Sequence, residues 1–82
     1  MKIYMFTAPW CEPCSVYKPV VLSALLDVAD VEVVDVTQQP DLASTFQVMT
    51  VPALRKVRPD GTVGVLDGVR TKTQIIKWLK EG

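Results

Sequence analysis

Short apolar runs separated by turn-forming residues predict four strands in this chain. They lie at Lys2–Thr7, Val31–Val36, Val51–Arg58 and Thr62–Leu66. The first two runs are nearly continuous in apolar, β-forming residues, as in strands that are buried on both faces of a sheet. The Asp60-Gly61 pair between the last two is a strong hairpin signal, so those two strands should be antiparallel neighbours.

Helical periodicity predicts a long helix from about Glu12 to Ala29. Its apolar residues recur every three or four positions, at Tyr17, Val21, Leu25 and Val28. Pro13 suits the first turn, where its missing N–H costs nothing, whereas Pro19 lies inside the pattern and should kink the helix. Asp30 is predicted to end the helix.

Two shorter helices complete the pattern. The turn 37–40 leads into one that places Leu42 and Phe46 on the same face. The last helix begins with Thr71-x-x-Gln74, a capping box in which each side chain can bond the backbone N–H of the other residue. Its apolar face consists of Ile75, Ile76, Trp78 and Leu79.

The order of these elements is β-α-β-α-β-β-α, which indicates an α/β fold in a single domain over residues 1–82. A strand–helix–strand segment requires a parallel crossover, and the hairpin adds antiparallel strands. We therefore expect a four-stranded mixed sheet covered by helices.

Composition and charge argue against several classes of function. Nine basic and nine acidic residues give a formal net charge of +0, whereas nucleic-acid modules normally carry a basic excess. Without histidine, the chain has no imidazole base and no histidine metal ligand. The longest apolar run, Val20–Leu26, contains Ser23 and is shorter than the roughly 18 residues of a membrane span. No stretch resembles a signal peptide, so we expect a soluble protein that binds neither nucleic acid nor membrane.

The two cysteines stand as Cys11-Glu12-Pro13-Cys14 at the start of the long helix. A disulfide that closes so short a loop restricts the unfolded chain little, because that stabilisation grows with loop length. Unpaired N–H groups and the helix dipole favour a thiolate at a helix N-terminus. We assign Cys11 as the nucleophile that attacks a disulfide and Cys14 as the thiol that resolves the mixed disulfide.

Two alternative roles for the cysteine pair stay open on the spacing alone. A structural zinc site needs about four ligands, so the chain would have to dimerise and supply four thiolates. Two unrelated structural cysteines could also have this spacing. A Cys-x-x-Cys that follows a strand and opens a helix in a β-α-β segment is nevertheless typical of a redox motif.

The chain resembles the thioredoxin/glutaredoxin superfamily over nearly its whole length. The resemblance is carried by Ala8-Pro9-Trp10-Cys11-Glu12-Pro13-Cys14, Pro19, Thr50-Val51-Pro52 and Gly68. It implies a minimal thioredoxin fold and a thiol–disulfide oxidoreductase whose redox-active disulfide joins Cys11 and Cys14.

The resemblance also implies a substrate-binding surface beside the cysteines. Pro52 matches a cis-proline next to the disulfide, and Val51 would offer its backbone to an extended substrate segment. Gly68 matches a glycine in the bordering loop, and it also suits a simple Asp67-Gly68 turn. The alternatives are a trans Pro52 at a strand start and a Trp10 that serves only in packing. The apolar collar around the substrate would consist of Trp10, Pro13, Val51, Pro52 and Val69.

The chain departs from thioredoxins in several places. Full-length thioredoxins have a further strand and helix before the active-site strand, so this chain is closer in size to glutaredoxins. The buried aspartate that thioredoxins place six residues before the first cysteine is Met5 here, and valines replace its companion lysine. Cys14 therefore has to rely on solvent, substrate or Glu12 as its base. Glu12 replaces the usual glycine of the motif, and its charge should oppose a thiolate at Cys11.

Glutaredoxins share the Thr50-Val51-Pro52 form of the loop, but this chain has residues 67–71 in place of their Gly-Gly turn and acidic helix cap. We therefore favour a cytoplasmic, monomeric protein-disulfide reductase that acts on disulfide-containing proteins without cofactor or metal. Its electron donor would be a thioredoxin-reductase-like enzyme or glutathione. The alternatives are a glutaredoxin-like, glutathione-dependent oxidoreductase and a redox-inert binding module that keeps the fold.

Three basic residues, Arg55, Lys56 and Arg58, fall in the third predicted strand, which is usually apolar in this fold. Either a small fold leaves that face partly open, so that these side chains reach solvent along their apolar stems, or they form a docking patch for an acidic partner. Met5 and Met49 are interpreted as core residues.

Overall fold

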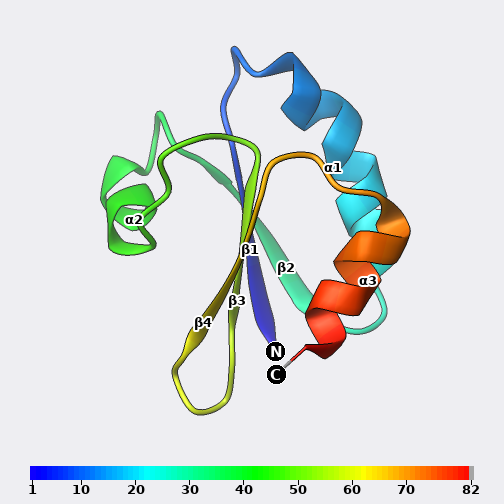
Figure 1. Cartoon of the computed structure of the whole chain (residues 1–82). Helices are drawn as coiled ribbons and strands as arrows, with labels where there is room; N and C mark the ends of the chain where they lie inside the picture. The colour runs from blue at the N-terminus through cyan, green and yellow to red at the C-terminus, as the bar shows by residue number, and fades with distance from the viewer. Residues whose placement is uncertain (82) are drawn as a thin grey trace.

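The computed structural model describes residues 1–81, and its helices and strands follow the predicted order β-α-β-α-β-β-α (Figure 1). The elements are β1 Lys2–Thr7, α1 Glu12–Leu25, β2 Asp30–Asp35, α2 Pro40–Thr45, β3 Ala53–Val57, β4 Val63–Asp67 and α3 Lys72–Lys80. The predicted domain 1–82 includes Gly82, which lies outside the described residues.

The strands form a mixed sheet in the order β2-β1-β3-β4, which confirms the predicted sheet. β1 is parallel to β2 and antiparallel to β3, and β3 is antiparallel to β4. The hairpin between β3 and β4 turns at Gly61, whose φ of +88° is a left-handed conformation that glycine adopts at little cost.

Helices cover both faces of the sheet, α1 and α3 on one face and α2 on the other (Figure 1). The buried core on the α1 and α3 face consists of Ile3, Met5, Tyr17, Val21, Leu25, Leu54, Ile75 and Trp78. The core on the α2 face consists of Phe6, Val34, Ala43 and Ala53. Because side chains alternate along a strand, the interior strand β1 contributes to both cores. This fixes the end of β1, from which the loop that carries the cysteines leaves the sheet.

The first helix is shorter than predicted. α1 ends at Leu25, and Val28, which was predicted on its buried face, is exposed. The reason is the pairing of the next strand. Asp30 donates its backbone N–H to the Met1 carbonyl and lies in register with Lys2, so residues 26–29 must turn the chain back toward β1. The prediction that Asp30 ends the helix is therefore wrong, because Asp30 begins β2.

The other strand boundaries differ from the prediction by one or two residues. β3 begins at Ala53, after Pro52, because proline has no N–H to donate to a neighbouring strand. It ends at Val57, so Arg58 lies outside the strand. β4 runs to Asp67, although the Asp67-Gly68 pair suggests a turn at that position.

Arg55 and Lys56 are both buried, with 3% and 0% of their surfaces exposed. Neither role predicted for the basic cluster holds for them, since they neither reach solvent nor form an open docking patch. Both side chains instead find acceptors inside the fold, as buried charged groups must. Arg55 donates to backbone carbonyls and to Asp67 on the α2 face. Lys56 donates to backbone carbonyls near the end of α3 on the other face.

The last helix begins as predicted. Thr71 Oγ1 accepts the N–H of Gln74 at 3.2 Å, and Gln74 Oε1 accepts the N–H of Thr71 at 2.9 Å, which completes the capping box. Ile75 and Trp78 of this helix are buried against α1 and the sheet. Among residues 1–81, no helix combines the length and the apolar character that crossing a membrane requires.

Candidate active site

The two cysteines lie where the loop after β1 enters α1. Cys11 is the N-cap residue of α1, and its backbone N–H donates to the Ala8 carbonyl at 3.1 Å. Its Sγ accepts the backbone N–H of Cys14 at 3.3 Å, in the position where serine or aspartate oxygens usually cap a helix. A disulfide joins Cys11 to Cys14, with their Cα atoms 5.3 Å apart.

The two cysteines differ in solvent exposure. Cys11 keeps 8% of its surface accessible, whereas Cys14 keeps 1% and faces the interior at the first turn of α1. When the pair is reduced, the helix dipole and the N–H of Cys14 both favour a thiolate at Cys11. Pro13 lies in the first turn of α1, where it withholds no hydrogen bond from the helix.

The segment before β3 completes one wall of the site. The Val51-Pro52 peptide bond is cis, as the resemblance implied, and the trans alternative is excluded. Val51 packs against the small cluster formed by Ala8, Cys11 and Cys14. The Pro52 carbonyl accepts the N–H of Gly68 at 3.0 Å, so the loop after β4 lies beside the cis-proline.

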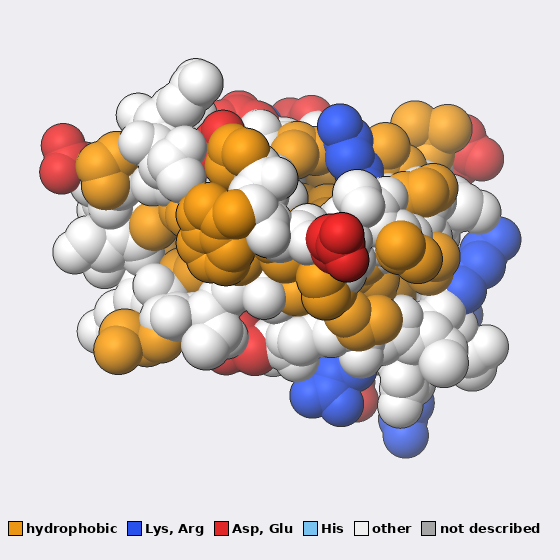
Figure 2. Space-filling model, turned by 90° about the horizontal axis from the view of Figure 1, so that it is seen from above, with side chains coloured by type: hydrophobic (Ala, Val, Ile, Leu, Met, Phe, Trp, Pro, Cys, Tyr) orange, Lys and Arg blue, Asp and Glu red, His pale blue; other side chains and the backbone are white. Residues whose placement is uncertain are grey.

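Gly68 has φ +83°, a conformation that favours glycine, and it leads directly into Val69. Val69 is exposed, and Trp10 is 70% exposed, so the alternative in which Trp10 serves only in packing does not hold. Figure 2 shows hydrophobic side chains gathered on this end of the molecule. Glu12 and Pro13 are exposed at the start of α1. Of the predicted collar, Trp10, Pro13 and Val69 are therefore exposed, whereas Val51 is half-buried and Pro52 is buried.

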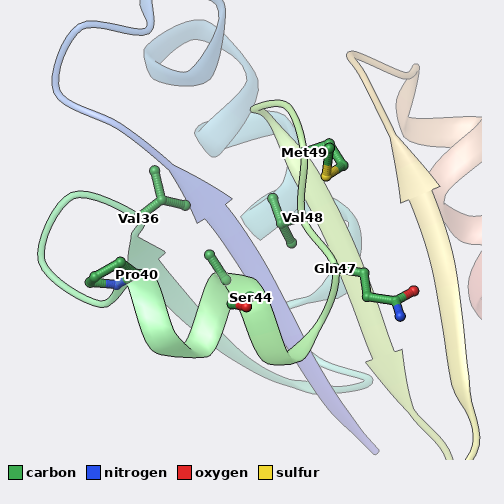
Figure 3. Close-up of a pocket in the computed structure, with 7 residues that line it drawn as sticks. Val36, Pro40, Ser44, Gln47, Val48 and Met49 are labelled. Atoms are coloured by element: carbon green, nitrogen blue, oxygen red, sulfur yellow. The ribbon is translucent and has the colours of Figure 1, made fainter.

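A groove continues this surface toward α2. A hollow of about 120 Å³ is lined by Trp10, Val36, Val48, Met49, Thr50 and Val51. A larger hollow of about 620 Å³ shares Val36, Val48 and Met49 with it and reaches Pro40 and Ser44 of α2 (Figure 3). We call these two hollows together the apolar groove.

The interpretation of Met49 as a core residue is wrong, whereas that of Met5 is confirmed. Met5 has 0% of its surface exposed, but Met49 has 91% exposed and lines both parts of the apolar groove. Sequence reasoning also missed Val36 and Val48 as groove residues. For Val48 the available signal was position, since a short segment that links a surface helix to an active-site loop runs over the surface, whereas Val36 directly follows β2.

A third hollow, of about 280 Å³, borders the cysteines. Its lining includes Cys11, Cys14, Lys18 and Asp35. The Asp35 carboxylate accepts the Thr37 hydroxyl at 2.6 Å and the Thr37 N–H at 2.8 Å, and these bonds hold the pKa of Asp35 below its usual range. The site thus has charged groups at its edge, although Met5 occupies the buried position of the thioredoxin aspartate.

Comparisons with known proteins agree with this geometry. A family model described as Thioredoxin matches residues 2–81. A thioredoxin of Staphylococcus haemolyticus is 30% identical over 82 residues, which cover 96% of this chain and 79% of that protein. A protein disulfide isomerase-like protein of Arabidopsis thaliana is 30% identical over 93% of this chain and 14% of its own length.

Among solved structures, a mutant thioredoxin from Halobacterium salinarum superposes with a TM-score of 0.84 at 28% identity, covering 93% of this chain and 68% of that one. The family match and the Cys11–Cys14 disulfide together support thiol–disulfide oxidoreductase chemistry. The chain belongs to the thioredoxin family.

Proposed function

We propose that this protein is a protein-disulfide reductase in which Cys11 attacks the substrate and Cys14 resolves the mixed disulfide. The observation that carries the proposal is the asymmetry of the pair. Cys11 Sγ caps α1 and keeps 8% of its residue surface accessible, whereas Cys14 is 1% exposed. A substrate disulfide can thus approach Cys11 more readily than Cys14, the more deeply buried of the two.

The reaction consists of two thiol–disulfide exchanges. The Cys11 thiolate attacks one sulfur of a substrate disulfide, so a Cys11–substrate bond forms and the other substrate sulfur leaves as a thiolate. The Cys14 thiolate then attacks Cys11 Sγ and releases the second substrate thiolate. Two electrons pass to the substrate, whose sulfurs take up two protons, and the protein is left with the Cys11–Cys14 disulfide.

Cys14 has to lose its proton before the second exchange. Met5 offers no carboxylate, so we propose that solvent in the hollow lined by Cys11, Cys14, Lys18 and Asp35 accepts this proton. Glu12 is exposed on the first turn of α1, where it acts chiefly as a negative charge near Cys11.

We propose that the substrate chain lies in extended form against Val51, between Trp10 on one side and Val69 on the other. The apolar groove, in which Met49 is 91% exposed, would hold an apolar side chain of the substrate next to the attacked cysteine. Exposed apolar surface concentrated beside a reactive group is typical of a docking site for protein segments.

A donor must restore the dithiol after each turnover. We propose a monomer in the reducing cytoplasm, with a thioredoxin-reductase-like enzyme as donor in preference to glutathione. The reduction potential separates the two, because thioredoxin-like reductants lie near about −270 mV and glutaredoxins near about −200 to −230 mV. A pair that cannot cycle reversibly in a redox buffer series would favour the redox-inert binding module.

The roles of the two cysteines are tested by trapping. Cys14→Ser should accumulate a mixed disulfide between Cys11 and a protein substrate such as insulin, visible as a mass increase that dithiothreitol reverses. Cys11→Ser is the matched control and should form no such adduct under the same conditions. Trapping by Cys11→Ser instead of Cys14→Ser would reverse the assignment, and turnover of insulin by both variants at the wild-type rate would disprove the mechanism.

A further inference from the structure

Arg55 is a buried arginine in the interior strand β3. Its guanidinium donates Nε to the Phe46 carbonyl at 3.0 Å and Nη2 to the Gln47 carbonyl at 3.4 Å. Its Nη1 donates to the Leu54 carbonyl at 2.9 Å and to Asp67 Oδ1 at 2.6 Å. One side chain thus links the end of α2, the strand β3 and the end of β4.

The Phe46 and Gln47 carbonyls lie where α2 ends and the segment with the groove residues begins. Phe46 is the C-cap of α2, and Gln47 follows with φ 56°. The N–H of Gln47 donates to the Ser44 carbonyl and the N–H of Val48 to the Ala43 carbonyl, which is the Schellman arrangement of a helix end. That arrangement favours glycine at position 47, where a residue with a side chain is disfavoured in the left-handed region.

The bonds from Arg55 to the carbonyls of Phe46 and Gln47 stabilise this turn, since the last carbonyls of a helix otherwise lack partners. They therefore offset the unfavourable left-handed conformation of Gln47. The turn at Gln47 sets the direction in which residues 48–51 leave α2. These residues include Val48, Met49 and Val51, which line the apolar groove beside the disulfide.

The remaining acceptor, Asp67, ends β4 immediately before Gly68 and Val69. The Asp67 side chain is 50% exposed, but its partner Arg55 is 3% exposed, so the ion pair is fixed at its buried end. Gly68 in turn bonds the Pro52 carbonyl. The residues that immediately precede both loops, Phe46 and Gln47 before Val48–Val51 and Asp67 before Gly68–Val69, are therefore bonded to the same guanidinium.

We propose that Arg55 is a positioning residue that fixes the Val48–Val51 segment and the Gly68–Val69 loop relative to each other, and so determines how protein substrates fit beside Cys11. Arg55 does not touch the reacting sulfurs in this role. The planar fork of arginine suits several acceptors at once, which a lysine ammonium cannot reproduce. The expected effect of Arg55 on substrate kinetics rests on the proposed reductase function, whereas its effect on the order of the two loops can be measured separately.

Lys56 provides a matched control. It is the next residue in β3, it is equally buried, and it points to the opposite face, where its acceptors are the carbonyls of Trp78 and Glu81. Lys56→Met and Arg55→Met both remove a buried cation and leave a flexible apolar side chain. Only Arg55→Met removes bonds to the two loops beside the disulfide.

The first measurement is amide hydrogen exchange in the oxidised protein. In Arg55→Met, we expect exchange of the Val48 and Gly68 amides to become roughly tenfold faster or more, because local opening of these loops costs less. The Ile75 amide, which bonds the Thr71 carbonyl in α3, should keep its rate. Lys56→Met should leave Val48 and Gly68 unchanged. Unchanged exchange at Val48 and Gly68 in Arg55→Met, or equal acceleration in Lys56→Met, would overturn the proposal.

The second measurement is steady-state kinetics. With insulin, Arg55→Met should raise KM about tenfold with kcat nearly unchanged, because disordered loops must be ordered on binding. With 5,5′-dithiobis(2-nitrobenzoic acid), a small disulfide that needs little surface, the rate should stay within about twofold of wild type. Equal losses with both disulfides would show a general defect and contradict the positioning role.

If Arg55→Met does not fold, Asp67→Ala removes only the acceptor on the β4 side. It keeps Arg55 and its bonds to Phe46 and Gln47, so exchange should accelerate at Gly68 and not at Val48. Should the wild-type protein fail to reduce insulin, the proposed function fails, while the exchange rates of Val48 and Gly68 still decide the role of Arg55.

Discussion

Gly64 lies directly opposite Lys56 across β3 and β4, and its lack of a side chain provides the space in which Lys56 lies. A Cβ atom at position 64 would lie 2.6 Å from Cε and 2.8 Å from Cγ of Lys56, closer than carbon atoms approach without displacement. Lys56 is also held at its end, because Nζ donates to the carbonyls of Trp78 and Glu81 and lies 4.9 Å from the centre of the Trp78 ring.

This relationship predicts that Gly64→Ala destabilises the fold by about 1–3 kcal/mol, the cost of overpacking a closely packed site. In a Lys56→Ala background the two closest atoms are gone, and Arg58 Nη2 at 3.1 Å is the end of a flexible side chain, so the same substitution should cost less than about 0.5 kcal/mol. Urea unfolding of the four proteins gives the coupling energy. Strictly additive effects would show that Lys56 is not what excludes a side chain at position 64.

The capping box of α3 gives a prediction about local stability. Thr71→Ala removes the acceptor for the Gln74 N–H and should cost about 1 kcal/mol. For a domain of this size, that corresponds to a decrease in Tm of roughly 4–8 °C. Thr73→Ala is the matched control, since Thr73 lies exposed inside the same first turn. Calorimetry of both variants checks the result, and equal changes in Tm would contradict a capping role.

Local patterns predicted the elements that are determined by neighbouring residues. β1 matches its predicted range from Lys2 to Thr7, and the capping box fixes the start of α3 within one residue. The hairpin at Asp60-Gly61 likewise depends on the turn residues themselves. The Cys-x-x-Cys spacing places both sulfurs at one helix N-terminus, whereas the disulfide that joins them was implied by the family resemblance.

The errors concern features that depend on distant partners. α1 ends early because Asp30 pairs with β1, and no local signal marks that pairing. Arg55 and Lys56 are buried because backbone carbonyls of α2 and α3 meet them from opposite faces, which the sequence of β3 does not reveal. Met49 is exposed because of the turn at Gln47, a residue with no marked preference for the left-handed conformation.

The Asp60 carboxylate should make the free energy of unfolding depend on pH, and its hydrogen bonds determine the direction of the change. It accepts the Thr62 hydroxyl at 2.7 Å and the Thr62 N–H at 2.9 Å, and these bonds, led by the hydroxyl, lower the pKa of Asp60. A carboxylate whose pKa is lower in the folded state adds stability above its unfolded pKa. It loses that stability as pH falls through the folded value.

We therefore expect the free energy of unfolding to decrease as the solution is acidified below about pH 4, with a shallower decrease in Asp60→Asn. Thr62→Val keeps the carboxylate but removes the hydroxyl donor, so it should flatten the same part of the profile. Urea unfolding at a series of pH values measures both. Profiles parallel to wild type in both variants would show that the turn contributes nothing to acid stability.

Met49 gives a prediction about substrate docking. Because Met49 is 91% exposed, Met49→Glu should leave Tm nearly unchanged, and it should raise KM for insulin several-fold by placing a charge in the apolar groove. Leu26→Glu is the matched control, since Leu26 is 71% exposed at the opposite end of α1 from the cysteines. A similar increase in KM for both variants would mean that the groove does not bind substrate.

Glu12 lies between the two cysteines, so its charge acts on the Cys11 thiolate from the first turn of α1. We predict that Glu12→Gln lowers the pKa of the Cys11 thiol, because it removes a negative charge that opposes a second one nearby. Titration of the thiolate ultraviolet absorbance in the Cys14→Ser background assigns the change to Cys11. Asp27→Asn, which removes an exposed charge beyond the other end of α1, should have no effect.

The difference in thiol pKa between Glu12→Gln and its parent should shrink in 1 M salt, where the screening length falls to about 3 Å. A difference that persists unchanged in that salt would point to an altered helix start instead of a charge effect.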